Sequence, residues 1–134
     1  MGDPALPERA GQLVVYILED DESVRRAFSR LMRSAGIEAR AYSRPEEFLA
    51  EVDNDSRGVI LLDIGVPTSA GSEVLGRLRE AHISLPVIVL SAHDDDDSQH
   101  YAREQGARML LHKPTDNQAL LDAIQWVAGA HPAR

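Results

Sequence analysis

The stretch VILLDIGVP, residues 59–67, decides the fold class of this chain. Four apolar residues in a row, two of them β-branched, are typical of a strand that is buried on both faces, as in parallel sheets. Asp63 follows at the carboxyl end of that strand, where Gly65 and Pro67 favour a turn. Ligands bind at this edge of open α/β sheets. A lone strand-end aspartate more often solvates or caps a loop, so the other strand ends must decide its role.

Four further segments have strand character, and helical patterns separate them. Strands are predicted at residues 13–18, 38–42, 59–62, 86–90 and 109–111. Helical patterns follow each of them, and the fourth, at residues 95–105, has only Tyr101 and Ala102 as apolar candidates. We expect that helix to be the least firmly packed element. The alternation predicts an α/β fold, a doubly wound five-stranded parallel sheet with helices on both faces.

The helices carry capping signals and buried stripes. Two pairs have capping-box spacing, Ser43 with Glu46 and Thr115 with Gln118, and Gly36 is expected to end the first helix. The predicted buried stripes are Val24, Phe28, Leu31, Met32 and Ala35; Phe48, Leu49 and Val52; Val74, Leu75 and Leu78; and Leu120, Ile124 and Val127.

The carboxyl ends of the strands carry side chains suited to phosphoryl transfer. In order they are Glu19, Asp20, Asp63, Ser91 and Lys113. Three clustered carboxylates repel one another unless cations lie among them, and a divalent ion together with Lys113 would make the cluster formally neutral. Asp63 can then act as a nucleophile toward phosphorus. The metal and Lys113 would bind the oxygens that gain negative charge, and Ser91 would donate to the third oxygen.

The predicted cofactor is Mg²⁺, a hard ion that prefers oxygen ligands. Because Mg²⁺ takes only one or two carboxylates, we expect Asp20 and Asp63 as direct ligands and Glu19 to act through water. The turn after Asp63 brings the backbone carbonyl of Gly65 near enough to be a further ligand.

Composition narrows the class of protein. The net charge of −8 argues against nucleic-acid binding by this chain alone, and the absence of cysteine suits a reducing compartment. We see neither a signal peptide nor an apolar run near the ~20 residues that span a bilayer. We therefore expect a cytoplasmic protein with no membrane contact. Its expected parts are a flexible arm at 1–12, one domain at 13–130 and a tail at 131–134.

Motifs after four of the strands occur together in one known family. They are Glu19-Asp20, residues 63–71, Ser91-Ala92 and Lys113-Pro114. With these motifs the chain resembles, over about residues 13–130, the receiver domain of bacterial response regulators, the phospho-accepting half of two-component signalling. The resemblance implies a flavodoxin-like fold. It also implies a signalling domain, not an enzyme, that catalyses only its own phosphorylation and dephosphorylation.

The resemblance assigns roles to the matched residues. Asp63 takes a phosphoryl group from a sensor histidine kinase or a histidine phosphotransfer protein, and Glu19 and Asp20 hold Mg²⁺. Ser91 is the switch hydroxyl, Lys113 senses the phosphoryl group, and the bond between Lys113 and its following proline is cis. The chain would be a single-domain regulator or one receiver of a larger regulator.

Three positions depart from the family pattern. Leu110 stands where members usually have an aromatic ring that swings inward, Thr115 replaces a common phenylalanine, and Glu19 replaces a more frequent aspartate. The residues needed for phosphoryl transfer are therefore retained, whereas the aromatic residue that usually transmits the switch is replaced. One hypothesis is that residues 94–105 rearrange instead, and the other is that Leu110 simply packs.

Trp126 raises the question of a partner surface. It shares a helical stripe with Ala119 and Ala123, which we expect to lie away from the core. Such a tryptophan is usually half buried at a helix edge. The family often forms homodimers through the last two helices and the fifth strand, which gives Trp126 the alternative role of an interface residue.

Other functions fit the sequence less well. An aspartate-nucleophile phosphatase normally has a second aspartate two residues after the first, where Gly65 stands, and a flavin-binding protein needs a phosphate loop where four acids follow the first strand. A degenerate receiver that binds partners without phosphorylation remains the alternative, although every chemical residue is retained.

Overall fold

The computed structural model of the chain describes residues 13–54, 57–63, 69–92 and 96–129, and of residues 69–72 the backbone only. The strands are β1 Leu13–Glu19, β2 Glu38–Tyr42, β3 Arg57–Asp63, β4 Val87–Ser91 and β5 Met109–His112. The helices are α2 Glu22–Ser34, α3 Pro45–Glu51, α4 Ser69–Glu80, α5 Asp96–Glu104 and α6 Asn117–Gly129. The expected arm at 1–12, tail at 131–134 and the ligand Gly65 lie outside the described residues.

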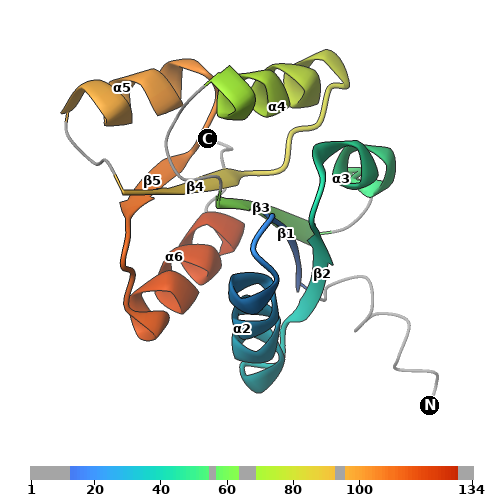
Figure 1. Ribbon diagram of the computed structural model, residues 1–134, viewed down its shortest axis with the longest axis vertical. Helices are drawn as coiled ribbons and strands as arrows, with labels where there is room; N and C mark the ends of the chain where they lie inside the picture. Colours follow the sequence, from blue (N-terminus) through green and yellow to red (C-terminus); the bar gives the residue numbers. More distant parts are fainter. Residues whose placement is uncertain (1–12, 55–56, 64–68, 93–95, 130–134) are drawn as a thin grey trace.

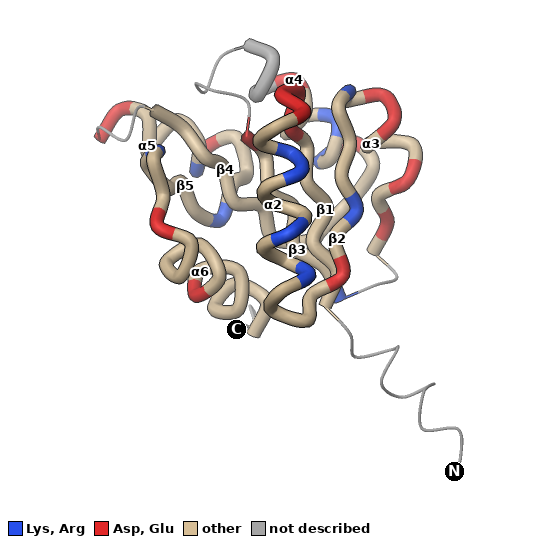
Figure 2. Tube along the Cα trace, turned by 60° about the horizontal axis from the view of Figure 1, so that its bottom comes forward, with Lys and Arg blue, Asp and Glu red and all other residues tan. Residues whose placement is uncertain are grey.

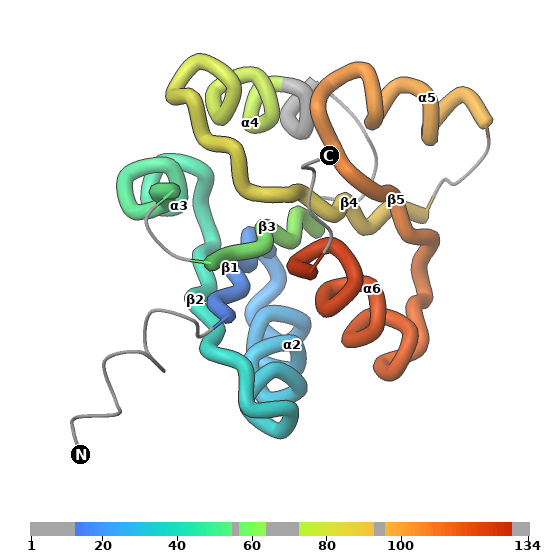
Figure 3. The backbone as a smooth tube through the Cα atoms, turned by 180° about the vertical axis from the view of Figure 1, so that it is seen from behind, coloured from blue at the N-terminus to red at the C-terminus, as the bar shows by residue number. Residues whose placement is uncertain are grey.

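The five strands form one parallel sheet in the order β2-β1-β3-β4-β5. Figure 1 shows α2 and α6 on one face of this sheet and α3, α4 and α5 on the other. The view from behind in Figure 3 shows the same two layers of helices. The predicted doubly wound α/β fold is thus confirmed, and none of the described helices is long and apolar enough to cross a membrane.

Each face of the sheet has its own apolar core because alternate strand residues point to opposite sides. In β3, Ile60 and Leu62 pack toward α3, α4 and α5, whereas Val59 and Leu61 pack toward α2 and α6. All four are fully buried. Apolar residues on both sides of the same strand are what the continuous run in the sequence requires.

Two predicted capping boxes are wrong. Helix α3 begins after Arg44, which makes no side-chain capping bond, because Pro45 occupies the first helical position. Helix α6 begins at Asn117, and Oδ2 of Asp116 accepts from the backbone N–H of Ala119 at 3.0 Å. The hydroxyl of Thr115 instead donates to the carbonyl of His112. In both cases the cap lies one residue nearer the helix than the sequence pattern suggests.

Two alanines also differ from the sequence prediction. Ala123 belongs to the core between α6 and the sheet, although its spacing placed it on the outer stripe with Trp126. Ala35 is exposed at the C-cap of α2, because the chain turns there to Gly36, whose φ of 75° ends the helix as predicted. Alanine fits either environment, so helical spacing alone assigns it poorly.

Helix α5 has few buried side chains, but α2 and α3 also have one buried residue each, so its being the least firmly packed element stays a prediction. Ala102 is its one buried residue. The neighbouring strand residue Leu110 is buried in the core on the side of α3, α4 and α5. This position supports the packing role of Leu110, whereas the rearrangement of residues 94–105 stays a prediction.

Gly58, at the start of β3, has no room for a side chain. A Cβ there would lie 3.0 Å from Leu85 Cδ1 and 3.2 Å from Cε1 of the fully buried Tyr16. We expect Gly58→Ala to lower the free energy of unfolding by about 1–3 kcal/mol, because tightly packed neighbours must shift. Urea titration followed by circular dichroism measures this.

Gly129 supplies the matched control for Gly58. It ends α6 with nothing within 4 Å of its Cβ position. Gly129→Ala should leave stability unchanged or slightly raised, since alanine favours helix. An equal decrease in the free energy of unfolding of the two variants would contradict the explanation that close packing at Gly58 causes the loss.

Candidate functional site

The pairing of β1 with β3 brings the first two site residues together. These strands are parallel, and their register sets Glu19 directly beside Asp63 at the carboxyl ends. Both side chains are buried, with 4 % and 3 % of their surface exposed. Two carboxylates that the sequence separates by more than forty positions therefore share one desolvated edge of the sheet.

Lys113 supplies a positive charge at this edge. Its Nζ lies 2.5 Å from Oδ1 of Asp63, and its side chain is 35 % exposed while that of Asp63 is 2 % exposed. The lysine follows β5, and its peptide bond to Pro114 is cis, as the resemblance implies. Lys113 thus reaches from the surface to a buried carboxylate, a geometry in which the ion pair offsets the cost of burying one charge.

Ser91 completes the set of strand-end residues. It is fully buried at the end of β4, and its carbonyl accepts a 2.7 Å hydrogen bond from the backbone N–H of Lys113. That backbone bond fixes the start of the segment after β5 against the end of β4. Of the residues predicted for catalysis, the structure therefore places Asp63, Ser91 and Lys113 at the ends of three adjacent strands.

The second carboxylate, Glu19, is held in an environment that opposes its ionisation. Burial and a hydrogen bond with the side chain of Asp63 raise the pKa of Glu19 to about 8, against the lowering effect of the Asp21 backbone N–H, which donates to Oε2 at 2.7 Å. The negative charge of Asp63 acts in the same raising direction. This acidic pair is a place where a cation would be stabilised.

The residues predicted as metal ligands are only partly assembled. Asp20 is exposed, although its side chain contacts the carboxyl group of Glu19, and Gly65 is outside the described residues. Among the residues that the structure describes, no group of three or more His, Cys, Asp or Glu side chains is placed to hold a metal ion. The donors present are carboxylate oxygens in an electronegative setting, and this fits a hard divalent cation. The division between direct and water-mediated ligands stays a prediction.

A groove leads from the surface to Asp63. It has a volume of about 360 Å³ and a mostly apolar wall. Its lining residues are Val24, Phe28, Asp63, Leu90, Lys113, Pro114 and Thr115. The groove lies between α2 and the segment after β5, so a donor group can approach the buried carboxylate there.

Two supporting interactions were not predicted from the sequence. Oδ1 of Asp21 accepts from the backbone N–H of Val24 at 3.1 Å and caps α2, and Arg25 Nη1 donates to the carbonyl of Glu19 at 2.9 Å. Asp21 directly follows Glu19 and Asp20, the two acids assigned to the site from the sequence, and was itself given no role. A cap signal was available there, because an aspartate directly before an amphipathic helix is a common first residue.

Comparison with known proteins decides the family. The response regulator receiver domain, as a protein family, matches residues 15–125. The chain belongs to that family. The response regulator protein TodT of Pseudomonas putida is 35% identical over 112 residues, covering 84% of this chain and 49% of TodT. Nodulation protein W of Bradyrhizobium diazoefficiens is 32% identical, covering 87% of this chain and 52% of that protein.

Solved receiver structures agree with the fold. The receiver protein from Burkholderia phymatum is 35% identical, with a TM-score of 0.71 over 90% of this chain and 98% of its own. FixJ-N is 28% identical, with a TM-score of 0.76 over 92% of this chain and 98% of that structure. This receiver domain spans about half the length of the curated relatives given above. The interpretation as a degenerate receiver is not favoured by these comparisons.

The raised pKa of Glu19 predicts a pH-dependent stability in metal-free buffer. An ordinary glutamate pKa of 4.5 applies to the unfolded chain and about 8 to the folded one, so the folded state binds the proton more tightly. Stability should therefore fall as pH rises from about 5 to about 8, and Glu19→Gln should flatten that slope and raise the melting temperature at the upper end by a few degrees. Thermal melts at several pH values measure this.

An exposed glutamate supplies the control for Glu19. Glu80 lies at the end of α4, exposed to solvent. Glu80→Gln should keep the slope of the unmodified chain. A melting temperature that does not change over this pH range would contradict the raised pKa of Glu19.

Proposed function

We propose that this receiver domain accepts a phosphoryl group on Asp63 from a phosphohistidine of a sensor histidine kinase or a histidine phosphotransfer protein. The observation that supports it best is the buried carboxylate of Asp63, held 2.5 Å from Lys113 at the end of an open groove. A carboxylate oxygen attacks the phosphorus, the phosphorus–nitrogen bond breaks, and the imidazole leaves with the electron pair. The product is an acyl phosphate on Asp63.

The chain's own groups have distinct parts in that step. The ammonium group of Lys113 donates to the carboxylate of Asp63, and it can pair instead with the oxygens of the transferred phosphoryl group. Ser91, at the neighbouring strand end, donates a hydroxyl hydrogen bond to the phosphoryl group and is the proposed switch residue. The apolar wall of the groove, including Phe28, limits water around the acceptor.

The proposed cofactor is Mg²⁺, held by Asp20, Asp63, the carbonyl of Gly65 and, through water, Glu19. When bound, the ion supplies positive charge that offsets the carboxylates and the phosphoryl oxygens. Glu19 supports the proposal because its burial beside Asp63 opposes its ionisation, and a cation at this edge would favour the ionised carboxylate. Glu19 also accepts from the backbone N–H of Asp21, which orients the carboxylate toward the site.

The longer relatives support a proposal for the biological setting. NtrC of Salmonella typhimurium, a DNA-binding transcriptional regulator, is 34% identical over 103 residues that make up 22% of its length. We propose that this domain is a cytoplasmic switch, either a regulator by itself or the receiver of a longer one, and that it catalyses only its own phosphorylation and dephosphorylation. Its charge of −8 argues against direct contact with nucleic acid by these 134 residues.

Intact-protein mass spectrometry tests the acceptor. After incubation with Mg²⁺ and acetyl phosphate, the chain should gain one phosphoryl group, because a small acyl phosphate can replace the protein donor at the same carboxylate. Asp63→Asn and metal-free samples should gain none. Asp97→Asn, which changes an exposed aspartate of α5, should gain the group as the unmodified chain does.

Phosphorylation that survives Asp63→Asn would refute the assignment of the acceptor. Absence of any gain, combined with failure of beryllofluoride to bind in the presence of Mg²⁺, would refute the proposed function itself. Binding of beryllofluoride without a mass gain would instead indicate fast hydrolysis of the acyl phosphate.

A homodimer through α5, β5 and α6 is proposed as well. Trp126 on α6 is 63% exposed and is the one large hydrophobic side chain found exposed in the described part of the chain. The side chain is thus more exposed than the half-buried position at a helix edge that is usual for such a tryptophan. Aromatic residues are enriched in protein interfaces, which supports a role for Trp126 in self-association.

Sedimentation velocity over a dilution series tests the role of Trp126. Trp126→Ala should weaken self-association of the phosphorylated chain by about tenfold or more, as expected for a central aromatic contact. Gln125→Ala, its exposed neighbour on α6, should have little effect. Identical association of Trp126→Ala and the unmodified chain would exclude this interface.

A further inference from the structure

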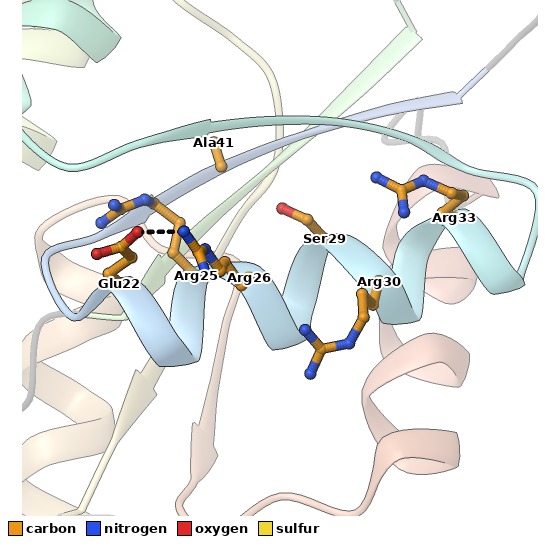
Figure 4. A pocket seen from close by; sticks show the side chains of 7 residues that line it. All are labelled: Glu22, Arg25, Arg26, Ser29, Arg30, Arg33 and Ala41. Atoms are coloured by element: carbon orange, nitrogen blue, oxygen red, sulfur yellow. Dashed lines mark ion pairs between the residues drawn. The ribbon is translucent and has the colours of Figure 1, made fainter.

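A second groove lies on the other side of α2, away from Asp63. It has a volume of about 330 Å³ and runs between α2 and the edge strand β2. Its lining residues are Glu22, Arg25, Arg26, Ser29, Arg30, Arg33 and Ala41. Figure 4 shows the arginines projecting from successive turns of α2, with Ala41 of β2 above the helix. Neither the acceptor Asp63 nor any residue given a role in phosphoryl transfer lines this groove.

The arginines form a concentrated positive patch on an acidic chain. Helix α2 contains four arginines and one acidic residue, whereas the chain as a whole has a net charge of −8. Figure 2 shows these basic positions following one another along α2. Arg26 and Arg30 are four positions apart, and Arg30 and Arg33 three, so like charges face each other on the helix surface and destabilise it. An anion in the groove would remove that repulsion.

Intramolecular partners use only part of this positive charge. Arg25 Nη1 donates to the carbonyl of Glu19, and Arg26 pairs with Glu22 at 2.6 Å. The Arg26 pair is 69% and 62% exposed, so it is weak and open to exchange. Within the described residues, Arg30 and Arg33 have neither a hydrogen bond nor an ion pair, and both are exposed. Two complete guanidinium groups are therefore available to a ligand.

We propose that this groove, called here the arginine groove, binds a small anion that carries two or more phosphate groups. Guanidinium groups bind phosphate oxygens through two parallel N–H bonds, which makes arginine the preferred residue for such ligands. The arginines from Arg25 to Arg33 extend over about 12 Å of helix, more than one phosphate group can contact. The hydroxyl of Ser29 adds a neutral donor inside the row.

The size of the groove favours a small molecule over a macromolecule. Its volume lies at the lower end of the range of about 300–1,000 Å³ found for small-molecule sites. The chain as a whole has a net charge of −8, which disfavours the broad contact that a nucleic acid would make. This inference goes beyond phosphoryl transfer at Asp63 and does not depend on it.

Isothermal titration calorimetry with inorganic tripolyphosphate tests the arginine groove. The titration uses metal-free buffer and the Asp63→Asn chain, so that metal-bridged binding at the acceptor site is absent. The double variant Arg30→Gln/Arg33→Gln should bind about tenfold more weakly or not at all, since it loses two charge-assisted contacts. Both residues are exposed, so the fold should persist, which circular dichroism checks.

Arg103→Gln/Arg108→Gln is the matched control. It removes two exposed arginines elsewhere and gives the same net charge, so it should keep the affinity of the parent chain. Arg30→Lys/Arg33→Lys keeps the charge and loses the paired N–H groups, and it should bind several-fold more weakly.

Three results would overturn the proposal. They are equal weakening in the Arg103/Arg108 control, no saturable binding of tripolyphosphate, and binding of a glutamate-rich peptide as tight as that of tripolyphosphate. The last result would identify the arginine groove as a docking surface for acidic protein segments. None of these results bears on acetyl phosphate labelling of Asp63, so the two proposals fail separately.

Discussion

The paired burial of Glu19 and Asp63 is the constraint on which the site depends. The register of β1 and β3 fixes the two carboxylates side by side, and burial removes the water that would otherwise screen them. Lys113 lies 2.5 Å from Asp63, while burial and the neighbouring Asp63 raise the pKa of Glu19 to about 8. Ionisation of both carboxylates at this edge is therefore opposed by their proximity and burial, and a cation bound there would favour the ionised form of the pair.

The apolar packing of the rest of the fold offsets the cost of burying these carboxylates. Strands β1, β3 and β4 are covered by helices on both faces. The two apolar cores therefore stabilise the sheet independently of its charged end. The acids sit where the strands stop, and the segments that leave them are held by local bonds. Asp21 caps α2, and the backbone N–H of Lys113 donates to the carbonyl of Ser91. The stabilising apolar packing thus lies in the middle of the sheet, and the unfavourable burial of carboxylates lies at its edge.

The sequence predicts the elements and the edge well because both depend on strong local signals. A buried parallel strand needs a continuous apolar run, and residues after such runs must meet at one edge, so Asp63, Ser91 and Lys113 could be grouped from the sequence. Features that depend on exact helix starts were not predictable in this way. Pro45 and Asp116 each displaced a capping pair that had the right spacing, and Ala123 was assigned to the wrong face. The arginine groove was also missed, because it requires α2 to lie against β2, and no local pattern specifies that contact.

Helix α2 connects the two charged regions of the molecule. Its apolar side, with Phe28, lines the groove to Asp63, while its arginines line the groove against β2. Arg25 belongs to both regions, because it lines the arginine groove and donates to the carbonyl of Glu19. Its bond goes to the backbone of Glu19, at the end of the strand whose register sets that residue beside Asp63. Arg25 thus places the proposed arginine groove next to the strand end that carries the acidic pair, although its own contact there is with the main chain.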